Sequence, residues 1–140
     1  MILGLMAVAQ PNKGEDRKKI DAMKVAYLTD QLNLTKVEAE KFWPVYNEFS
    51  KSTQQMRRDG MKSIFEPLKD DKELSKAESE ELLNQYINDI KAMQAAELKL
   101  INDLRAILPA KKIMKLRIAE EGFKRRMLDR LKGEDLRGRN

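Results

Sequence analysis

The sequence predicts an all-α protein built from four amphipathic helices in a bent, elongated, hairpin-like arrangement. Charged residues make up 36% of the 140 positions and aromatic residues only 6%, a composition that favours helices over strands. Apolar residues recur every three or four positions, which is the spacing of a single helix face. A leucine followed by Thr or Ser, two further residues and Glu, a pattern typical of helix starts, occurs twice. The high charge content also requires a large surface, which long helices or an oligomer supply.

The first helix is expected over residues 15–34, where Asn33 breaks the pattern near its end. Its apolar residues lie three and four positions apart, with one polar exception. The predicted face consists of Ile20, Met23, Tyr27, Gln31 and Leu34. A helix with one such face has to bury it against another helix or a second chain.

The second helix is expected to begin at a capping box. The Glu38 amide can donate to the Thr35 hydroxyl, while the Thr35 amide donates to the Glu38 carboxylate. Leu34, directly before the cap, is placed to act as a hydrophobic staple. The three-four spacing then continues, so this helix is predicted to run to about residue 58.

An aromatic cluster with a proline lies inside this helix. Trp43 with Phe42, Tyr46 and Phe49 is half of the aromatic inventory within eight positions. The cluster could line a ligand pocket, but aromatic residues at helical spacing more often form a core where helices cross. Pro44 costs about 3 kcal/mol in a helix interior, while each buried aromatic side chain stabilises by about 1.5–3 kcal/mol. We therefore expect one bent helix, with Trp43 anchoring the bend in the core.

The longest connection is expected over residues 57–73. Gly60, Pro67 and a run of mixed charge occur there, and each disfavours a regular helix. A single short turn is predicted around residues 63–65.

A second capping box, Ser75 with Glu78 after Leu74, opens the third helix. No Gly or Pro follows until Pro109, so this helix should have about 30 residues and a length of roughly 45 Å. Its predicted face consists of Leu83, Tyr86, Ile90, Met93, Glu97, Leu100, Leu104 and Leu108. Like the first face, it has to be buried against other helices or a second chain.

Pro109 suits the first turn of a fourth helix, where its missing N–H costs nothing. The predicted face of this helix consists of Ile113, Leu116, Glu120, Phe123 and Met127. The pattern fades near Gly133, so residues 10–132 are expected to form one helical domain and residues 133–140 a basic, flexible tail.

The first nine residues predict export. They are apolar up to Ala9, and Ala7-Val8-Ala9 fits the small-x-small pattern of a signal-peptidase site. The run is too short to cross a bilayer and lacks a positively charged start, so we interpret it as the remnant of a signal peptide and predict no transmembrane segment. No Cys follows it, which excludes a lipoprotein anchor.

The residue inventory argues against an enzyme. The chain has no Cys and no His, so it has no Ser-His-Asp or Cys-His triad and no zinc site of the usual kind. It contains no Gly-rich phosphate loop and no calcium-binding loop pattern. The acidic pairs, such as Glu120-Glu121, are adjacent on a helix and do not face each other. The sequence therefore predicts no catalytic residue, no metal site and no cofactor.

Two segments rich in Met, Arg and Lys are candidates for a binding surface. Met side chains adapt to varied shapes, and Arg adds charge and a planar stacking group, although such segments are also common on plain solvated helices. The candidate residues are Met56, Arg57, Arg58, Met61, Lys62, Phe65, Phe123, Arg125, Arg126, Met127 and Arg130. Residues 124–140 carry +4 of the net charge of +5, which could attract acidic proteins, anionic lipid or nucleic acid. Export would remove nucleic acid as a partner.

The two helix starts, at residues 34–38 and 74–78, resemble the paired L-T-x-x-Q motifs of the Spy/CpxP family of small periplasmic proteins. The segment KVAYLTDQLNLTKVEAEKFWPVYNEF, with the Leu-Pro before the last basic helix, is similar to a branch common in the Bacteroidetes. Members of that branch often bear labels such as periplasmic heavy-metal sensor or sigma-factor sensor. Glu38 and Glu78 stand where the family has Gln, and the His used by metal-responsive members is missing, which argues against metal sensing here.

The resemblance covers about residues 18–132 and implies four helices per chain in an antiparallel, cradle-shaped homodimer. It implies a periplasmic, ATP-independent chaperone, or holdase, that binds unfolded or partly folded proteins under envelope stress. The alternative is a signalling accessory that binds one periplasmic partner, such as a sensor or an anti-sigma factor.

Overall fold

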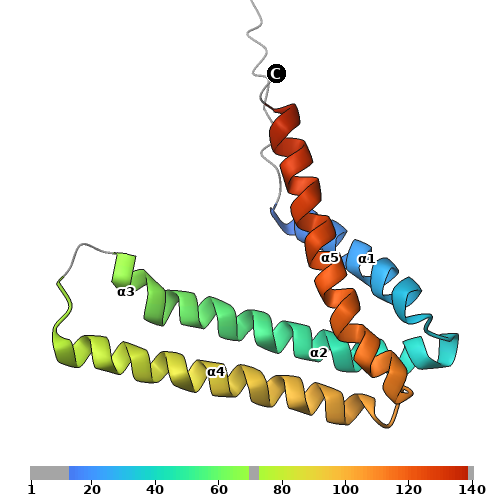
Figure 1. The fold of residues 1–140 in the computed structure, drawn as a ribbon, viewed down its shortest axis with the longest axis horizontal. Helices are drawn as coiled ribbons and strands as arrows, with labels where there is room; N and C mark the ends of the chain where they lie inside the picture. The colour runs from blue at the N-terminus through green and yellow to red at the C-terminus, as the bar shows by residue number, and fades with distance from the viewer. Residues whose placement is uncertain (1–12, 70–72, 139–140) are drawn as a thin grey trace, which may run out of the picture. The chain divides into compact units, whose positions relative to one another are not determined.

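The structure is a computed structural model that describes residues 13–69 and 73–138 (Figure 1). Over these ranges the predicted all-α class is confirmed, with no strand. The helices are α1 (Lys13–Leu32), α2 (Lys36–Gly60), the π-helix η1 (Met61–Phe65), α3 (Glu66–Lys69), α4 (Lys76–Leu104) and α5 (Ala110–Arg137). None of the described helices is long and apolar enough to cross a membrane. The predicted signal remnant, residues 1–9, lies outside the described residues.

The chain divides into two compact units. We call residues 35–113, which contain α2, η1, α3, α4 and the first turn of α5, the hairpin unit. We call residues 1–34 together with residues 114–140 the terminal unit, whose described helices are α1 and the rest of α5.

The hairpin unit begins at the predicted capping box. The Glu38 amide donates to Thr35 Oγ1 over 3.1 Å, and the Thr35 amide donates to Glu38 Oε1 over 2.9 Å. From there α2 runs without a break through Pro44, so one helix rather than two is confirmed. The bend that we expect at Pro44 stays a prediction.

Helical structure continues where the sequence predicts the longest connection. After Gly60 the chain enters the five-residue π-helix η1 and then the short helix α3, which contains Pro67. The Glu66 amide donates to the Met61 carbonyl, a bond across five residues, and the next residue is Pro67, which has no N–H to donate. The prediction of a connection with one short turn at residues 63–65 was therefore wrong, because a wide π turn accommodates the Gly and Pro within helical structure.

α4 lies antiparallel beside α2 and η1, which makes the hairpin seen in Figure 1. Its 29 residues agree with the predicted length of about 30, and the Glu78 amide donates to Ser75 Oγ at its start over 3.1 Å. This is one of the two hydrogen bonds of the second predicted capping box.

The core of the hairpin unit contains the predicted aromatic cluster. Phe42 and Tyr46 are buried and stacked, with ring centroids 5.2 Å apart, and Trp43 meets Phe42 edge-on at 4.9 Å. Leu104 of α4, with 0% exposure, is also fully buried. The burial of Phe42 and Tyr46 agrees with the prediction of a core, while Trp43 and Phe49 are half-buried at its edge.

In the terminal unit, α1 ends as Asn33 predicts. Asn33 has a φ of 48°, its amide donates to the Asp30 carbonyl, and the Leu34 amide donates to the Thr29 carbonyl. These two bonds form a Schellman motif, which Asn tolerates because its side chain allows a left-handed backbone. The helix therefore stops at Leu32, two residues before the predicted end.

The predicted buried face of α1 was partly wrong. Leu28 and Leu32 are the fully buried residues, while Ile20 is 44% exposed and Gln31 is exposed. Leu28 and Leu32 are also four positions apart, so the sequence pattern allows a face rotated by one residue, or about 100°. Packing selects the rotated face because it buries leucine in place of glutamine.

The predicted face of α5 is confirmed at its centre, where Leu116 and Phe123 are buried together with Ala119. The predicted end was wrong, since α5 continues through Gly133 to Arg137. A single glycine in a helix costs only about 1 kcal/mol, and the flanking Leu, Lys and Glu residues favour helix.

Candidate functional site: two binding surfaces

The largest departure from the predicted core lies at one end of the hairpin unit. The predicted apolar face of α4 is buried at Leu100 and Leu104 but exposed in the first half of the helix. There Leu83 is 56% exposed and Ile90 is 42% exposed. The two halves have the same spacing of apolar residues, so the sequence pattern by itself does not distinguish them.

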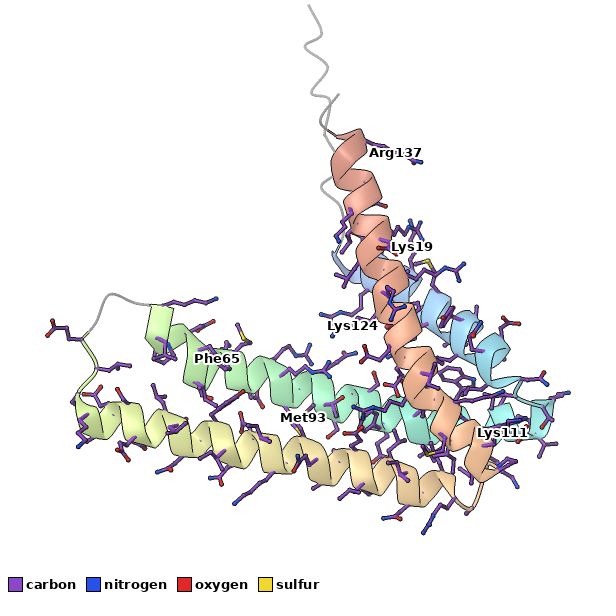
Figure 2. All side chains as sticks on the ribbon, in the orientation of Figure 1. Lys19, Phe65, Met93, Lys111, Lys124 and Arg137 are labelled. Atoms are coloured by element: carbon purple, nitrogen blue, oxygen red, sulfur yellow. The ribbon has the colours of Figure 1, made fainter. Side chains whose placement is uncertain are left out.

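The η1 and α3 segment adds further exposed apolar side chains at this end. Phe65 meets Tyr86 of α4 edge-on, with ring centroids 5.8 Å apart, which joins the two contributions into one surface. Figure 2 marks Phe65 near the end of the hairpin and Met93 farther along α4. We call this the hairpin-end surface, formed by Met61, Phe65, Leu68, Leu83, Tyr86, Ile87 and Ile90.

A close approach of α2 and α4 lies next to this surface. Gly60 is buried, and a Cβ at this position would lie 2.9 Å from Asp89 Oδ2. Any side chain here would require Asp89 to move. The glycine that the sequence suggests as a helix breaker therefore serves the contact between two helices.

Six of the predicted binding residues belong to α2 and η1 of the hairpin unit. Met61 and Phe65 are part of the hairpin-end surface, and Met56 is half-buried. Arg57, Arg58 and Lys62 are exposed, and Arg58 Nη2 donates to Gln55 Oε1 over 3.1 Å. The structure therefore combines three cations with exposed apolar side chains in one stretch of helix.

The other five predicted residues belong to α5 of the terminal unit. Phe123 is 7% exposed and packs its ring 5.7 Å from that of Tyr27, so it belongs to the core, and its remaining surface lines the groove described below. Arg125, Arg126 and Arg130 are exposed and Met127 is half-buried. Lys124, marked in Figure 2, lies on the same helix.

The second candidate surface is a groove of about 590 Å³ between α1 and α5. Four residues predicted from sequence line it, namely Phe123, Arg126, Met127 and Arg130. The α1 side consists of Met23, Ala26, Tyr27 and Asp30. Met23 and Tyr27 were predicted only as part of a helix face, and Ala26 and Asp30 were not predicted. Their contribution depends on which helix packs beside α1, which the spacing of residues does not specify.

Glu38 forms an ion pair as well as a cap. Lys112 Nζ lies 2.6 Å from Glu38 Oε1, and both side chains are largely covered, at 21% and 15% exposure. The Lys112 hydrogen bond, followed by the Thr35 amide, lowers the pKa of the Glu38 carboxyl from 4.5. A glutamine here could form the cap but could not carry the charge that pairs with Lys112.

Within residues 13–69 and 73–138, no three His, Cys, Asp or Glu side chains gather in a way that could hold a metal ion. No family model matches the chain, and neither a curated protein nor a solved structure matches it. The resemblance to the Spy/CpxP family is therefore a hypothesis carried by the sequence motifs.

Proposed function

We propose that this protein is a periplasmic, ATP-independent holdase that binds exposed apolar segments of unfolded proteins. One observation supports this above the others, namely the hairpin-end surface, where seven large apolar side chains are at least 37% exposed. Contiguous exposed apolar surfaces on soluble proteins generally mark interaction sites. The motif resemblance to Spy/CpxP proteins supports the same function.

The chemistry of this surface suits varied clients rather than one fixed shape. Phe65 and Tyr86 offer flat aromatic faces, while Met61 has an unbranched side chain that repacks at low cost. Arg57, Arg58 and Lys62, close by in sequence, attract acidic segments over a longer range. Binding needs no nucleotide because apolar burial alone supplies the driving force.

An aggregation assay tests the holdase proposal. A thermally unfolded client is mixed with equimolar protein in the absence of ATP, and light scattering is followed. The wild type should suppress aggregation, and a Phe65→Asn, Leu83→Asn and Ile90→Asn triple variant should lose most of the suppression. All three side chains are exposed, so their replacement should leave the fold intact, as circular dichroism will check.

The matched control is Ile118→Asn with Met114→Asn. These side chains, on α5, are 74% and 73% exposed but lie outside the hairpin-end surface. The control should suppress aggregation like the wild type. Equal loss in both variants, or no suppression by the wild type at several-fold excess, would contradict the proposal.

We further propose a homodimer as the working form. Leu98 and Ile101, which are exposed on α4 outside the hairpin-end surface, would be covered if a second copy packed there. Sedimentation equilibrium at micromolar concentration should give twice the chain mass of 16.3 kDa. A single species at the chain mass across the accessible concentration range would contradict the dimer proposal.

A signalling accessory is the second candidate. The exposed basic side chains of α5, among them Arg125, favour an acidic partner protein. Site-specific photocrosslinking from position 125 in envelope extract should give one dominant product if the protein has one partner. A holdase should give many products, mainly from position 65.

A further inference from the structure

The groove of the terminal unit combines an aromatic and thioether floor with two cations. Tyr27 and Phe123, with ring centroids 5.7 Å apart, lie beside the flexible side chains of Met23 and Met127. Arg126 and Arg130, one helical turn apart on α5, complete the lining. The volume of about 590 Å³ is in the range typical of sites for small molecules.

The two guanidinium groups have donors left for an anion. The Arg126 guanidinium carbon lies over the Tyr27 ring, 5.5 Å from its centre, which is a cation–π contact. The N–H groups of a guanidinium point out of the edges of its plane, where they can bind a carboxylate. In the described part of the chain Arg126 forms no ion pair. Arg130 contacts Met23 Sδ through Nη1 and lies 3.7 Å from Glu134, a long ion pair at an exposed position.

The charged residues of the groove lie at opposite ends, with the arginines at one end and Asp30 toward the other. Met23 contacts Arg130 and Tyr27 contacts Arg126, so α1 and α5 are antiparallel here. Asp30, also in the lining, follows Tyr27 by nearly one turn and so lies toward the end away from Arg130. A bound anion is attracted to the arginine end and repelled from the Asp30 end.

The walls do not suit a peptide backbone. The lining residues belong to α1 and α5, and their backbone groups are bonded within the helices or, for the Asp30 carbonyl, to the Asn33 amide at the end of α1. A peptide in the groove would leave its own backbone groups without partners from the wall. A ligand with one charged head and a plain hydrocarbon chain has no such groups.

We propose that this groove binds a single-chain carboxylate amphiphile, with the carboxylate between Arg126 and Arg130 and the chain over Tyr27 and Phe123. The two guanidiniums bind the head, and the apolar floor removes the chain from water. Such binding goes beyond the holdase proposal and does not depend on it, because the hairpin-end surface belongs to the other unit.

The test uses the full chain labelled with ¹³C at the methionine methyl groups, with dodecanoate below its micelle concentration as the probe. Dodecanoate should shift the Met23 and Met127 signals and leave those of Met56, Met61 and Met93 in the hairpin unit unchanged. Dodecyltrimethylammonium, which has the same chain and the opposite charge, should not shift Met23 or Met127 at the same concentration.

Replacing both cations should weaken dodecanoate binding by roughly tenfold or more, since each hydrogen bond to a charged group is lost. The variant is Arg126→Gln with Arg130→Gln, and the matched control is Arg125→Gln, an exposed arginine outside the lining. The control should bind within about twofold of wild type.

Three results would overturn the proposal. The first is an equal loss in the Arg125→Gln control, which would show a diffuse charge effect. The second is a dodecanoate response confined to the hairpin-unit methionines. The third is a short acidic aromatic peptide that shifts Met23 and Met127 and displaces dodecanoate, which would assign the groove to polypeptide instead.

Discussion

The two halves of α4 carry apolar residues at the same spacing but meet different surroundings. In the second half, Leu100 and Leu104 pack into the core that contains Phe42 and Tyr46, and their exposure is 5% and 0%. In the first half, Leu83 and Ile90 keep 56% and 42% of their surface. One amphipathic helix can therefore contribute to the core at one end and leave its apolar side chains exposed for binding at the other. The helix packed opposite determines which half of α4 is buried, since the aromatic cluster of α2 lies only beside the second half.

Truncation of a core residue should give the largest difference between the two halves. Phe42→Ala should lower the free energy of unfolding by about 3–5 kcal/mol, because it leaves a cavity at a fully buried site. Ile90→Ala, at an exposed site in the first half, should cost less than about 1 kcal/mol. Urea unfolding followed by circular dichroism measures both values. Similar losses would mean that the first half is buried in solution, as in a tight dimer.

The two helix caps should give a smaller effect. Thr35→Ala and Ser75→Ala each remove one side-chain acceptor. The loss should be about 1–2 kcal/mol at Thr35, where it also loosens the reciprocal bond from the Thr35 amide to Glu38, and about 0.5–1 kcal/mol at Ser75. The same urea experiment measures them. A larger loss of unfolding free energy for Ser75→Ala would show that the exposed end of the hairpin contributes more to stability than the burial of its side chains indicates.

The smallest effect should come from the charge of Glu38 and should depend on pH. The folded state lowers the pKa of this carboxyl, so its ionised form stabilises the fold above the ordinary value of 4.5, and this contribution is lost as the pH falls through the lowered pKa. Glu38→Gln keeps the cap but loses the pair with Lys112. The variant should therefore unfold at a lower temperature than wild type at pH 7, and the two should converge as the pH falls below the lowered pKa. A difference that does not change with pH would indicate a role for shape rather than charge.

Much of the fold was predictable because its signals are local. The Thr35 box, the Asn33 stop and the Gly- and Pro-free run up to Pro109 each depend on neighbours within one or two helical turns. The burial of Phe42 and Tyr46 followed from the usual behaviour of aromatic residues at helical spacing. Three expectations were wrong because packing or backbone geometry decided them: the buried face of α1, the connection after Gly60 and the end of α5.

The candidate surfaces were predictable only in part. The Met and Arg content of residues 56–65 marked one side of the hairpin-end surface, while its α4 side was assigned to a buried face. In the terminal unit, Arg126 and Arg130 were predicted as part of a basic surface. The contact of Tyr27 with that surface was not predicted. Both omissions concern residues more than 15 positions apart in the sequence, whose proximity no local pattern encodes.

The sequence by itself determined the helical class, the starts of α2 and α4, the aromatic core of α2 and the placement of most of the excess positive charge near the C-terminus. These features follow from the energies of single residues and of neighbours three or four positions apart. The tertiary structure decided which half of α4 stays exposed, which face of α1 is buried and where a groove forms beside Arg126. Those outcomes depend on which helix lies opposite. Burying apolar surface is favourable against any neighbouring helix, and only the folded chain determines which helix that is.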